Sequence, residues 1–341
     1  MSFRKAYSFD DVMLVPHFSR MGSRVEADLS TSIAGVELKI PIVAANMSSV
    51  TEDAMAIALG QMGGLGIIHR MSSVAKQKAM VERVHAAGQQ VGFSIGVGPD
   101  WRDRMDACRP YSSIACLDVA HGHHQRVLEL LKCYFEIYRD YPIIIGQIAT
   151  ARAANMFVEE AIPPQYRSTI AFKTSIGGGS LCTTRIKTGF GIPTLQAILD
   201  IAQSVPEGIS IIADGGIKDS GDIVKSLAAG ACSVMLGSLL AGTDEAPGGI
   251  IKAKDQLYKV YRGSASFGDK ALRGEETRNV EGEEALVSYK GSVQRVVGTL
   301  LDGVRSGFSY GGAHSIAELQ ANADFVEITM HGFAESLPHG K

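Results

Sequence analysis

The chain has 341 residues, with 33 lysines and arginines against 36 aspartates and glutamates, so its formal charge is −3. This balance does not support a broad basic surface for nucleic acid, and a hydrophobic content of 45% excludes a collagen-like or disordered chain. Glycine is the unusual total, because 38 residues exceed the usual share of about 7%. In a packed chain this glycine surplus is expected in turns.

The cysteines argue against a disulfide framework or a structural zinc site, because they are odd in number and form no C-x-x-C pair. They are Cys108, Cys116, Cys133, Cys182 and Cys232. The amino-terminal residues lack the apolar core of a signal peptide, and no apolar run reaches the roughly 18 residues that span a bilayer. We therefore expect a cytoplasmic protein that does not enter a membrane.

Eight short apolar runs, rich in β-branched residues, predict eight buried strands. They are residues 42–47, 65–69, 91–97, 114–119, 143–148, 170–174, 209–214 and 233–236. Segments with helical periodicity lie between most of them, at residues 53–62, 74–87, 124–138, 193–204 and 220–229. Strands that alternate with helices in this way favour an α/β fold, a closed (β/α)8 TIM barrel, with a doubly wound open sheet as the alternative.

Polar and glycine residues follow the predicted strands, at the end of a barrel where active sites form. Examples are Asn46, Asp118 and Gln147. The segment 243–291, after the eighth strand, is rich in Gly, Lys and Glu and is longer than an ordinary connection. We expect it to form a mobile flap within a single catalytic domain that spans residues 1–341.

Residues 175–191 form a glycine-rich loop after the sixth predicted strand. Its three consecutive glycines, 177–179, free the backbone for tight conformations just before Cys182. The loop predicts an exposed Cys182 thiolate that acts as a nucleophile, with Arg185 and Lys187 near enough to lower its pKa. The alternative, a small buried hydrophobe, suits Cys116 and Cys232 better, because each lies in or beside a strand.

Two glycine turns end the seventh and eighth strands, at Gly215-Gly216 and at Gly237-Ser238. Barrels of this kind commonly bind phosphate after those two strands. The amides of Gly216, Gly237 and Ser238 are suited to donate to phosphate oxygens. The Asp214 carboxylate is suited to accept from a pair of sugar hydroxyls. The two turns therefore predict a phosphorylated sugar ligand.

Together these motifs resemble the family that contains IMP dehydrogenase and GMP reductase, over nearly the whole chain. The segments that carry the resemblance are residues 9–16, 44–50, 179–185, 214–216, 241–248, 261–263 and 289–291. The sequence Gly-Ser-Leu-Cys-Thr-Thr-Arg at 179–185, combined with the Asp-Gly-Gly turn, is highly specific. The resemblance implies a barrel that usually forms a homotetramer, a purine ribonucleotide substrate, and a covalent bond between the cysteine and purine C2. Residues 71–90 form one short crossover, which leaves no room for the regulatory domain that many members insert there.

The sequence of the flap distinguishes members of this family that catalyse one reaction from those that catalyse the other. Dehydrogenases typically carry an Arg-Tyr pair there, which activates the water that hydrolyses the covalent intermediate, and residues 263–281 contain no such pair. Residues 45–47, 118–122, 187–191 and 279–282 also look more like the reductase, whereas 261–262 and 243–248 look more like the dehydrogenase. The resemblance therefore favours a GMP reductase that converts GMP to IMP and ammonia with NADPH.

The resemblance also implies roles for individual residues. Cys182 would attack C2, and Thr184 and Glu281 would protonate the leaving amino group. The residues implied to bind substrate are Ser48, Ser180, Asp214, Gly215, Gly216, Gly237, Ser238, Tyr261 and Gly263. NADPH would contact Asp118, Ala120 and Gln147, and the carbonyls of Gly177, Gly179 and Cys182 would hold a monovalent cation, K+.

Several residues depart from the family pattern. Gln147 stands where the family usually has Asn, and residues 175–179 read Ser-Ile-Gly-Gly-Gly in place of the commoner Gly-Ile-Gly-Pro-Gly. These changes bear on the cofactor and on the purine that is used. Two alternatives therefore stay open: an IMP dehydrogenase, which makes XMP with NAD, and a pseudoenzyme that binds purine nucleotides without turnover.

Overall fold

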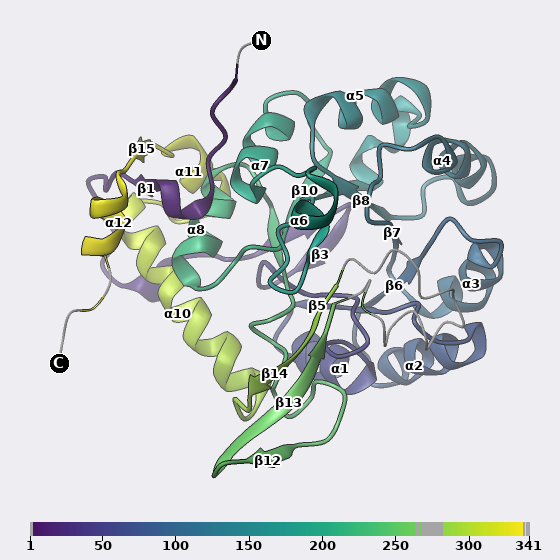
Figure 1. Cartoon of the computed structure of the whole chain (residues 1–341). Helices are drawn as coiled ribbons and strands as arrows, with labels where there is room; N and C mark the ends of the chain where they lie inside the picture. Colours follow the sequence, from purple (N-terminus) through teal and green to yellow (C-terminus); the bar gives the residue numbers. More distant parts are fainter. Residues whose placement is uncertain (1–2, 264–265, 267–281, 337, 339–341) are drawn as a thin grey trace.

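The computed structural model describes residues 3–263, 266, 282–336 and 338. Its centre is a closed barrel of parallel strands (Figure 1), in the order β10-β11-β4-β5-β6-β7-β8-β9. The strands are β4 (Ile42–Ala44), β5 (Leu65–Ile68), β6 (Val91–Ile95), β7 (Ile114–Asp118), β8 (Ile143–Ile148), β9 (Ile170–Thr174), β10 (Ser210–Asp214) and β11 (Ser233–Leu236).

All eight predicted strands are confirmed, and closure of the sheet rules out the open alternative. The strands are apolar along their length because helices cover one face and barrel side chains the other. β9, for example, is buried at every residue from Ile170 to Thr174. β4 ends earlier than predicted, because the chain turns at Ala45, whose carbonyl accepts from the Met47 amide at 2.7 Å.

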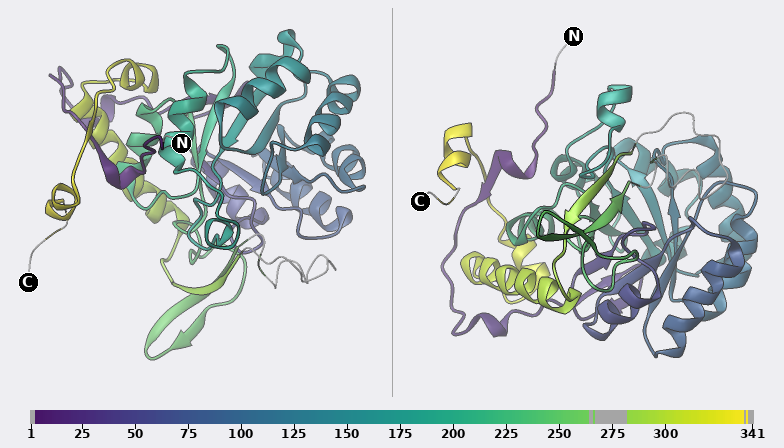
Figure 2. Two further views of the ribbon diagram at one scale, coloured as in Figure 1. Left: turned by 45° about the horizontal axis from the view of Figure 1, so that its top comes forward. Right: turned by 60° about the horizontal axis from the view of Figure 1, so that its bottom comes forward.

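Helices alternate with the strands and form the outer layer of the barrel (Figure 2). They are α1 (Asp53–Gln61), α2 (Val74–Ala86), α3 (Trp101–Cys108), α4 (Gln125–Tyr138), α5 (Ala151–Glu160), α7 (Thr194–Ala202) and α8 (Ser220–Ala228). Side-chain caps start several of them: the hydroxyls of Ser73 and Thr150 each accept from a backbone amide in the first turn. Among the described residues, no helix is both long and apolar enough to cross a membrane.

Elements at the two ends of the chain lie side by side (Figure 1). Strand β1 (Val12–Leu14) pairs antiparallel with β15 (Phe325–Glu327). The long helix α10 (Val293–Gly311) packs against α8, so the carboxyl-terminal part returns to the barrel. The remaining short elements are η1 (Phe9–Asp11), η2 (Arg24–Glu26), η3 (Arg109–Tyr111), η4 (Pro164–Thr169), α6 (Thr184–Thr188), α11 (Ile316–Ala321) and α12 (Met330–Glu335).

A β-hairpin covers the amino-terminal end of the barrel. Its strands β2 (Thr31–Ile33) and β3 (Val36–Leu38) pair antiparallel. Ile33 and Leu38 are buried in one apolar cluster with barrel residues such as Val43 and Ile144. The hairpin therefore fills the barrel interior at this end.

The described part of segment 243–291 contains a three-stranded antiparallel sheet, which extends away from the barrel (Figure 2). Its strands are β12 (Ile251–Ala253), β13 (Gln256–Arg262) and β14 (Glu284–Ser288). Movement of this segment as a flap stays a prediction.

A buried histidine and a carboxylate join three elements at the rim. His69 follows β5 and is 1% exposed. Its Nδ1 accepts from the Met71 amide at 3.0 Å, so Nε2 carries the proton that faces Glu52 Oε1 at 3.4 Å. The hydrogen bond from His69, helped by Lys76 and opposed by burial, lowers the pKa of Glu52 to about 2.

We expect the variant Glu52→Gln to be less stable than the wild type at neutral pH and to lose that deficit in acid. A carboxyl whose pKa is lowered by folding contributes stability above its unfolded pKa, here near 4.5, and loses it as the pH falls toward about 2. The deficit at pH 7 should be about 2 kcal/mol. Urea unfolding of both proteins at pH 7 and at pH 3.5 measures it. Glu82→Gln, which removes an exposed pair with Lys78, is the control; an equal deficit at both pH values would contradict the expectation.

Candidate active site

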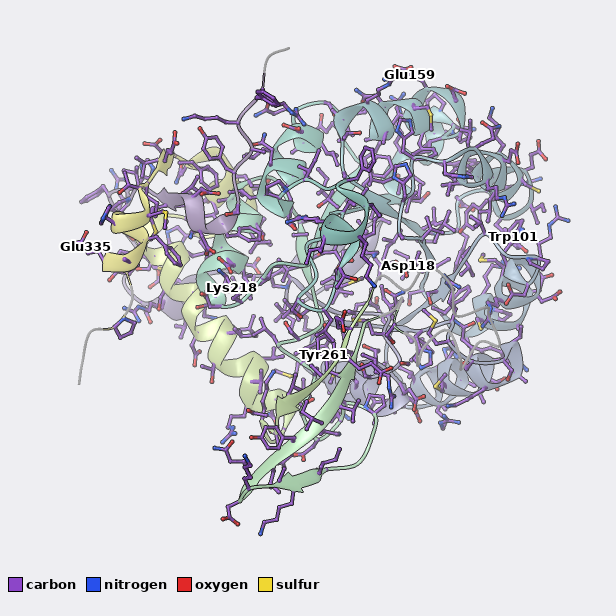
Figure 3. All side chains as sticks on the ribbon, in the orientation of Figure 1. Trp101, Asp118, Glu159, Lys218, Tyr261 and Glu335 are labelled. Carbon is purple, nitrogen blue, oxygen red and sulfur yellow. The ribbon has the colours of Figure 1, made fainter. Side chains whose placement is uncertain are left out.

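A cavity of about 690 Å³ opens at the carboxyl-terminal ends of the barrel strands. Its walls come from the ends of β4, β5, β7, β8, β9, β10 and β11, and from β13 of the antiparallel sheet. Figure 3 shows the side chains of Asp118, from β7, and Tyr261, from β13, in the central part of the molecule. The barrel therefore presents one large cavity at the end where its polar strand termini meet.

The structure brings together nearly all the residues that the sequence pointed to. Those that line the cavity are Asp118, Ala120, Gln147, Gly177, Gly179, Ser180, Cys182, Thr184, Asp214, Gly215, Gly216, Gly237, Ser238, Tyr261 and Gly263. Ser48 is not among the lining residues, although its neighbour Met47 is. Glu281 lies outside the described residues, and the next residue, Gly282, lines the cavity.

Cys182 lies between β9 and α6, on the loop expected to carry the nucleophile. Its Sγ is 3.2 Å from Thr184 Oγ1, and its amide donates to the Gly179 carbonyl at 3.0 Å. Arg185 closes the loop by donating to the carbonyls of Ile176 at 3.1 Å and Ile192 at 2.6 Å. The guanidinium thus holds the loop that carries Cys182.

The cysteine loop contacts the antiparallel sheet on its other side. Cys182 and Gly282 form an isolated antiparallel bridge, and the Glu283 amide donates to the Leu181 carbonyl at 3.0 Å. From β13, Tyr261 is 4% exposed, and burial raises the pKa of its hydroxyl. A neutral phenol is a hydrogen-bond donor, and the Tyr261 hydroxyl donates to Met47 Sδ at 3.8 Å in the cavity wall.

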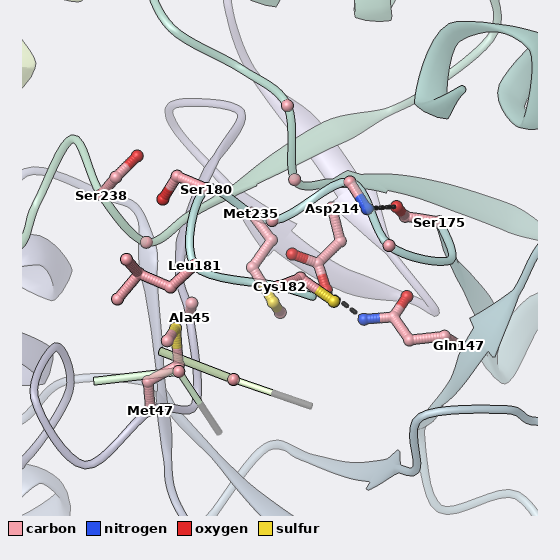
Figure 4. Close-up of a pocket in the computed structure, with 18 of the residues that line it drawn as sticks. Ala45, Met47, Gln147, Ser175, Ser180, Leu181, Cys182, Asp214, Met235 and Ser238 are labelled. Atoms are coloured by element: carbon pink, nitrogen blue, oxygen red, sulfur yellow. Dashed lines mark hydrogen bonds between the residues drawn. The ribbon is translucent and has the colours of Figure 1, made fainter. Parts of the chain in front are cut away.

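Three charged side chains, Asp118, Lys173 and Asp214, form the charged cluster at the floor of the cavity. Lys173 Nζ is 2.8 Å from Asp118 Oδ1 and 2.6 Å from Asp214 Oδ2, and its side chain is 2% exposed. The amide of Gln147 also donates to Asp214 Oδ2, and Figure 4 shows Gln147 and Asp214 beside Cys182. Two carboxylates from different strands therefore share one buried ammonium.

Mutual attraction favours the charged forms of Lys173 and Asp118. Burial alone would lower the pKa of Lys173, but Asp118 and Asp214 outweigh it and raise that pKa. Burial alone would raise the pKa of Asp118, but Lys173 outweighs it and lowers that pKa. Gly146 makes room for the lysine, because a Cβ there would lie 2.9 Å from Lys173 Cε. The cavity floor thus carries fixed charges at neutral pH.

Sequence reasoning missed Lys173, which lies in the apolar strand β9. One signal was present. A lysine inside a short run of buried residues must have a charged partner, since lysine is almost never fully buried alone. Asp118 and Asp214 end strands on either side of β9 in the barrel order, but pairing them with Lys173 required that order.

The Asp-Gly-Gly turn after β10 approaches the cysteine loop closely. Gly215 has a φ of +94°, and a Cβ at this position would lie 2.9 Å from the carbonyl carbon of Gly178. Backbone meets backbone here, so a larger residue could not be accommodated by a side-chain rotation. The position of the cysteine loop therefore depends on a glycine at the end of the neighbouring strand, β10.

We expect Gly215→Ala to lower kcat by about tenfold or more, because the added methyl displaces the loop that carries Cys182 and also strains a left-handed backbone. Steady-state kinetics of the variant and of the wild type measure the effect. Gly248→Ala is the matched control, since Gly248 has the same φ of +94° but no atom within 4 Å of an added Cβ. Equal loss in both variants would show that strain alone, without loop displacement, lowers activity.

The other cysteines differ from Cys182 in their surroundings. Cys108 and Cys116 are fully buried. Burial raises the pKa of Cys108 to about 12 and also raises that of Cys116. These thiols pack as small apolar groups, whereas Cys182 lines the cavity.

Comparisons with known proteins agree with this architecture. A family model described as "IMP dehydrogenase / GMP reductase domain" matches residues 6–339. The chain is 30% identical to inosine-5'-monophosphate dehydrogenase of Nitrosopumilus maritimus (strain SCM1), over 99% of each chain. It is 34% identical to the same enzyme of Cryptosporidium parvum, over 98% of this chain and 95% of the relative. It is 35% identical to GMP reductase of Lactobacillus delbrueckii subsp. bulgaricus, over 95% of each.

The fold and these matches place the chain among the barrel oxidoreductases that act on purine nucleotides. More narrowly, it belongs to the IMP dehydrogenase / GMP reductase family, whose members use nicotinamide cofactors.

Proposed function

We propose that this protein is a GMP reductase, which converts GMP and NADPH to IMP, ammonium and NADP+ with uptake of two protons. The observation that carries the proposal is the contact around the nucleophile: Cys182 Sγ lies 3.2 Å from Thr184 Oγ1, and Cys182 is bridged to Gly282, the residue after Glu281. A reductase needs a proton donor at C2, because an amino group leaves well only when protonated. The Thr184 hydroxyl suits that task, and the family resemblance assigns Glu281 to it as well.

The proposed steps follow from the residues in the cavity. The Cys182 thiolate adds to C2 of GMP, and Thr184 with Glu281 protonates the amino group, which departs as ammonia and leaves a thioimidate. NADPH supplies the hydride that reduces C2. The thiolate then leaves as IMP forms. Residues 263–281 lack the Arg-Tyr pair that would activate water, which disfavours hydrolysis to XMP.

The nucleotide would be held at both ends of the cavity. In this proposal Asp214 accepts from the ribose hydroxyls, and the remaining residues contact phosphate or base. They are Ser48, Ser180, Gly215, Gly216, Gly237, Ser238, Tyr261 and Gly263. Their backbone amides and hydroxyls are donors, as a phosphate dianion requires.

The cofactor site has one feature that fits an amide-bearing ligand. Gln147 Oε1 is buried and has no hydrogen-bond partner among the described residues, whereas Nε2 of the same amide donates to Asp214. An unpaired buried acceptor favours a ligand with N–H donors, such as a carboxamide. We assign Gln147, Asp118 and Ala120 to NADPH.

The carbonyls of Gly177, Gly179 and Cys182 share one loop and suit K+ as ligands. Gly179 already accepts from the Cys182 amide, and its second lone pair stays available. The proposal is completed by a cytoplasmic homotetramer, as is usual in the family.

IMP dehydrogenase is the second candidate, because most of the relatives named above carry that name and residues 261–262 and 243–248 resemble it. Incubating the protein with GMP and NADPH, and separately with IMP and NAD, separates the two. NADPH oxidation with ammonium release supports the reductase. NADH formation with XMP overturns it in favour of the dehydrogenase, and nucleotide binding without either reaction leaves a pseudoenzyme.

A further inference from the structure

Two lysines, one in the antiparallel sheet and one just after it, bind main-chain carbonyls of the segment that follows β11. Lys259, in β13, donates to the carbonyls of Thr243 at 2.9 Å and Asp244 at 3.3 Å, and also to that of Ala246. Lys290, just after β14, donates to the carbonyls of Ser238 at 2.5 Å and Leu239 at 3.0 Å. Lys259 thus holds the sheet to the segment that leads into it, whereas Lys290 reaches the turn at the cavity wall.

That turn is the one assigned above to the phosphate. Gly237 and Ser238 line the cavity, and Figure 4 shows Ser238 and Ser180 at the same end of it. The amides of Leu240 and Ala241 both donate to the Gly237 carbonyl, at 3.0 and 2.9 Å. The turn is therefore closed on one side by its own hydrogen bonds and held on the other side by the Lys290 ammonium.

The electrostatics of Lys290 differ from those of Lys259. Lys259 lies near the carboxylates of Asp244 and Glu245, which partly offset its burial. Lys290 is partly buried, and burial lowers the pKa of its ammonium. Within the described part of the chain, its hydrogen bonds go to uncharged carbonyls. A partly desolvated cation that meets only dipoles is stabilised by an anion bound nearby.

We propose that Lys290 is a positioning residue for the phosphate group, which holds the Ser238 turn in place and adds positive charge behind it. The proposal rests on the nucleotide site proposed above. It predicts that Lys290 sets the preference for a nucleoside monophosphate over the nucleoside. An ammonium bound to the Leu239 carbonyl also polarises that peptide group, which strengthens the hydrogen bond from the Leu240 amide to the Gly237 carbonyl.

Calorimetric titration with IMP and with inosine tests the proposal. IMP is a ligand of the reductase and of the dehydrogenase alike, so the test does not depend on which reaction runs. For Lys290→Met we expect the Kd of IMP to rise by roughly tenfold to a hundredfold, the usual effect of losing hydrogen bonds to a charged group. The Kd of inosine should change by less than about threefold, because inosine lacks the phosphate. Lys290→Arg keeps the charge and the donors and should restore most of the IMP affinity.

Lys252→Met is the matched control, since Lys252 lies on β12 of the same sheet with a side chain 71% exposed; it should leave both affinities unchanged. If Lys290→Met does not fold, Lys290→Gln removes the charge with a polar side chain and carries the same test. An equal loss of IMP and inosine binding, or no loss, would overturn the role of Lys290 alone. A wild type that binds IMP no better than inosine would overturn the phosphate site itself, and this proposal with it.

Discussion

Replacing Cys182 by alanine should reduce kcat by about a thousandfold or more, in whichever reaction the wild type performs. In the proposed mechanism the Cys182 thiolate forms the covalent bond to C2, and no other described cysteine lines the cavity to replace it. Losing a nucleophile removes the covalent route, and the binding groups that remain supply only part of the rate. Binding of IMP should change by less than about threefold, because the phosphate and ribose contacts are intact.

Cys133→Ala provides the control for this variant. Cys133 lies in α4, and its Sγ accepts from Arg102 at 2.7 Å, away from the cavity. Its loss should leave kcat unchanged. Turnover assays and calorimetry on both variants measure the contrast. Retained activity in Cys182→Ala would refute the covalent mechanism, and equal loss in both variants would point to general damage by cysteine removal.

Replacing Lys173 by methionine should destabilise the protein by about 3–5 kcal/mol at neutral pH, since it leaves two buried carboxylates without their shared cation. The deficit should shrink in acid. Without Lys173, burial and the charge of Asp214 raise the pKa of Asp118. When folding raises the pKa of a carboxyl, the protein is most stable below the pKa of that group in the unfolded chain. It loses stability as the pH rises through the pKa of the group in the folded protein. Urea unfolding at pH 8 and pH 5 measures the change.

Lys78→Met is the control, because it breaks an exposed pair with Glu82 and should cost well under 1 kcal/mol. The double variant Lys173→Met, Asp118→Asn should recover part of the lost stability, since one carboxylate remains where there were two. A deficit for Lys173→Met that is the same at pH 8 and pH 5 would contradict the charged cluster as the cause.

The sequence predicts the barrel well because its strands are short, apolar and evenly alternated with helices. The helices predicted at 53–62 and 74–87 from their periodicity each agree with the structure to within one residue. Long-range pairing is a different matter. The β1–β15 pair and the β2–β3 hairpin depend on segments too short to be recognised from periodicity, and neither was predicted.

The candidate site shows the same division. Strand ends and glycine turns pointed to Asp118, Gln147 and Asp214, because residues at the carboxyl end of a barrel converge. Lys173 was missed, since its partners are set by the order of strands around the barrel and not by distance along the chain. The sequence does not single out Lys290, because its acceptors are the backbone carbonyls of Ser238 and Leu239, and every residue type has such a carbonyl.

The β2–β3 hairpin has a kinetic consequence. Because Ile33 and Leu38 fill one end of the barrel, ligands would enter and leave through the cavity at the opposite end. Two ligands that bind at different depths would then share a single entrance, so the ligand that binds second would have to dissociate first. The shape of the cavity would thus fix the order of binding and release. Product inhibition patterns should then follow an ordered scheme and not a random one.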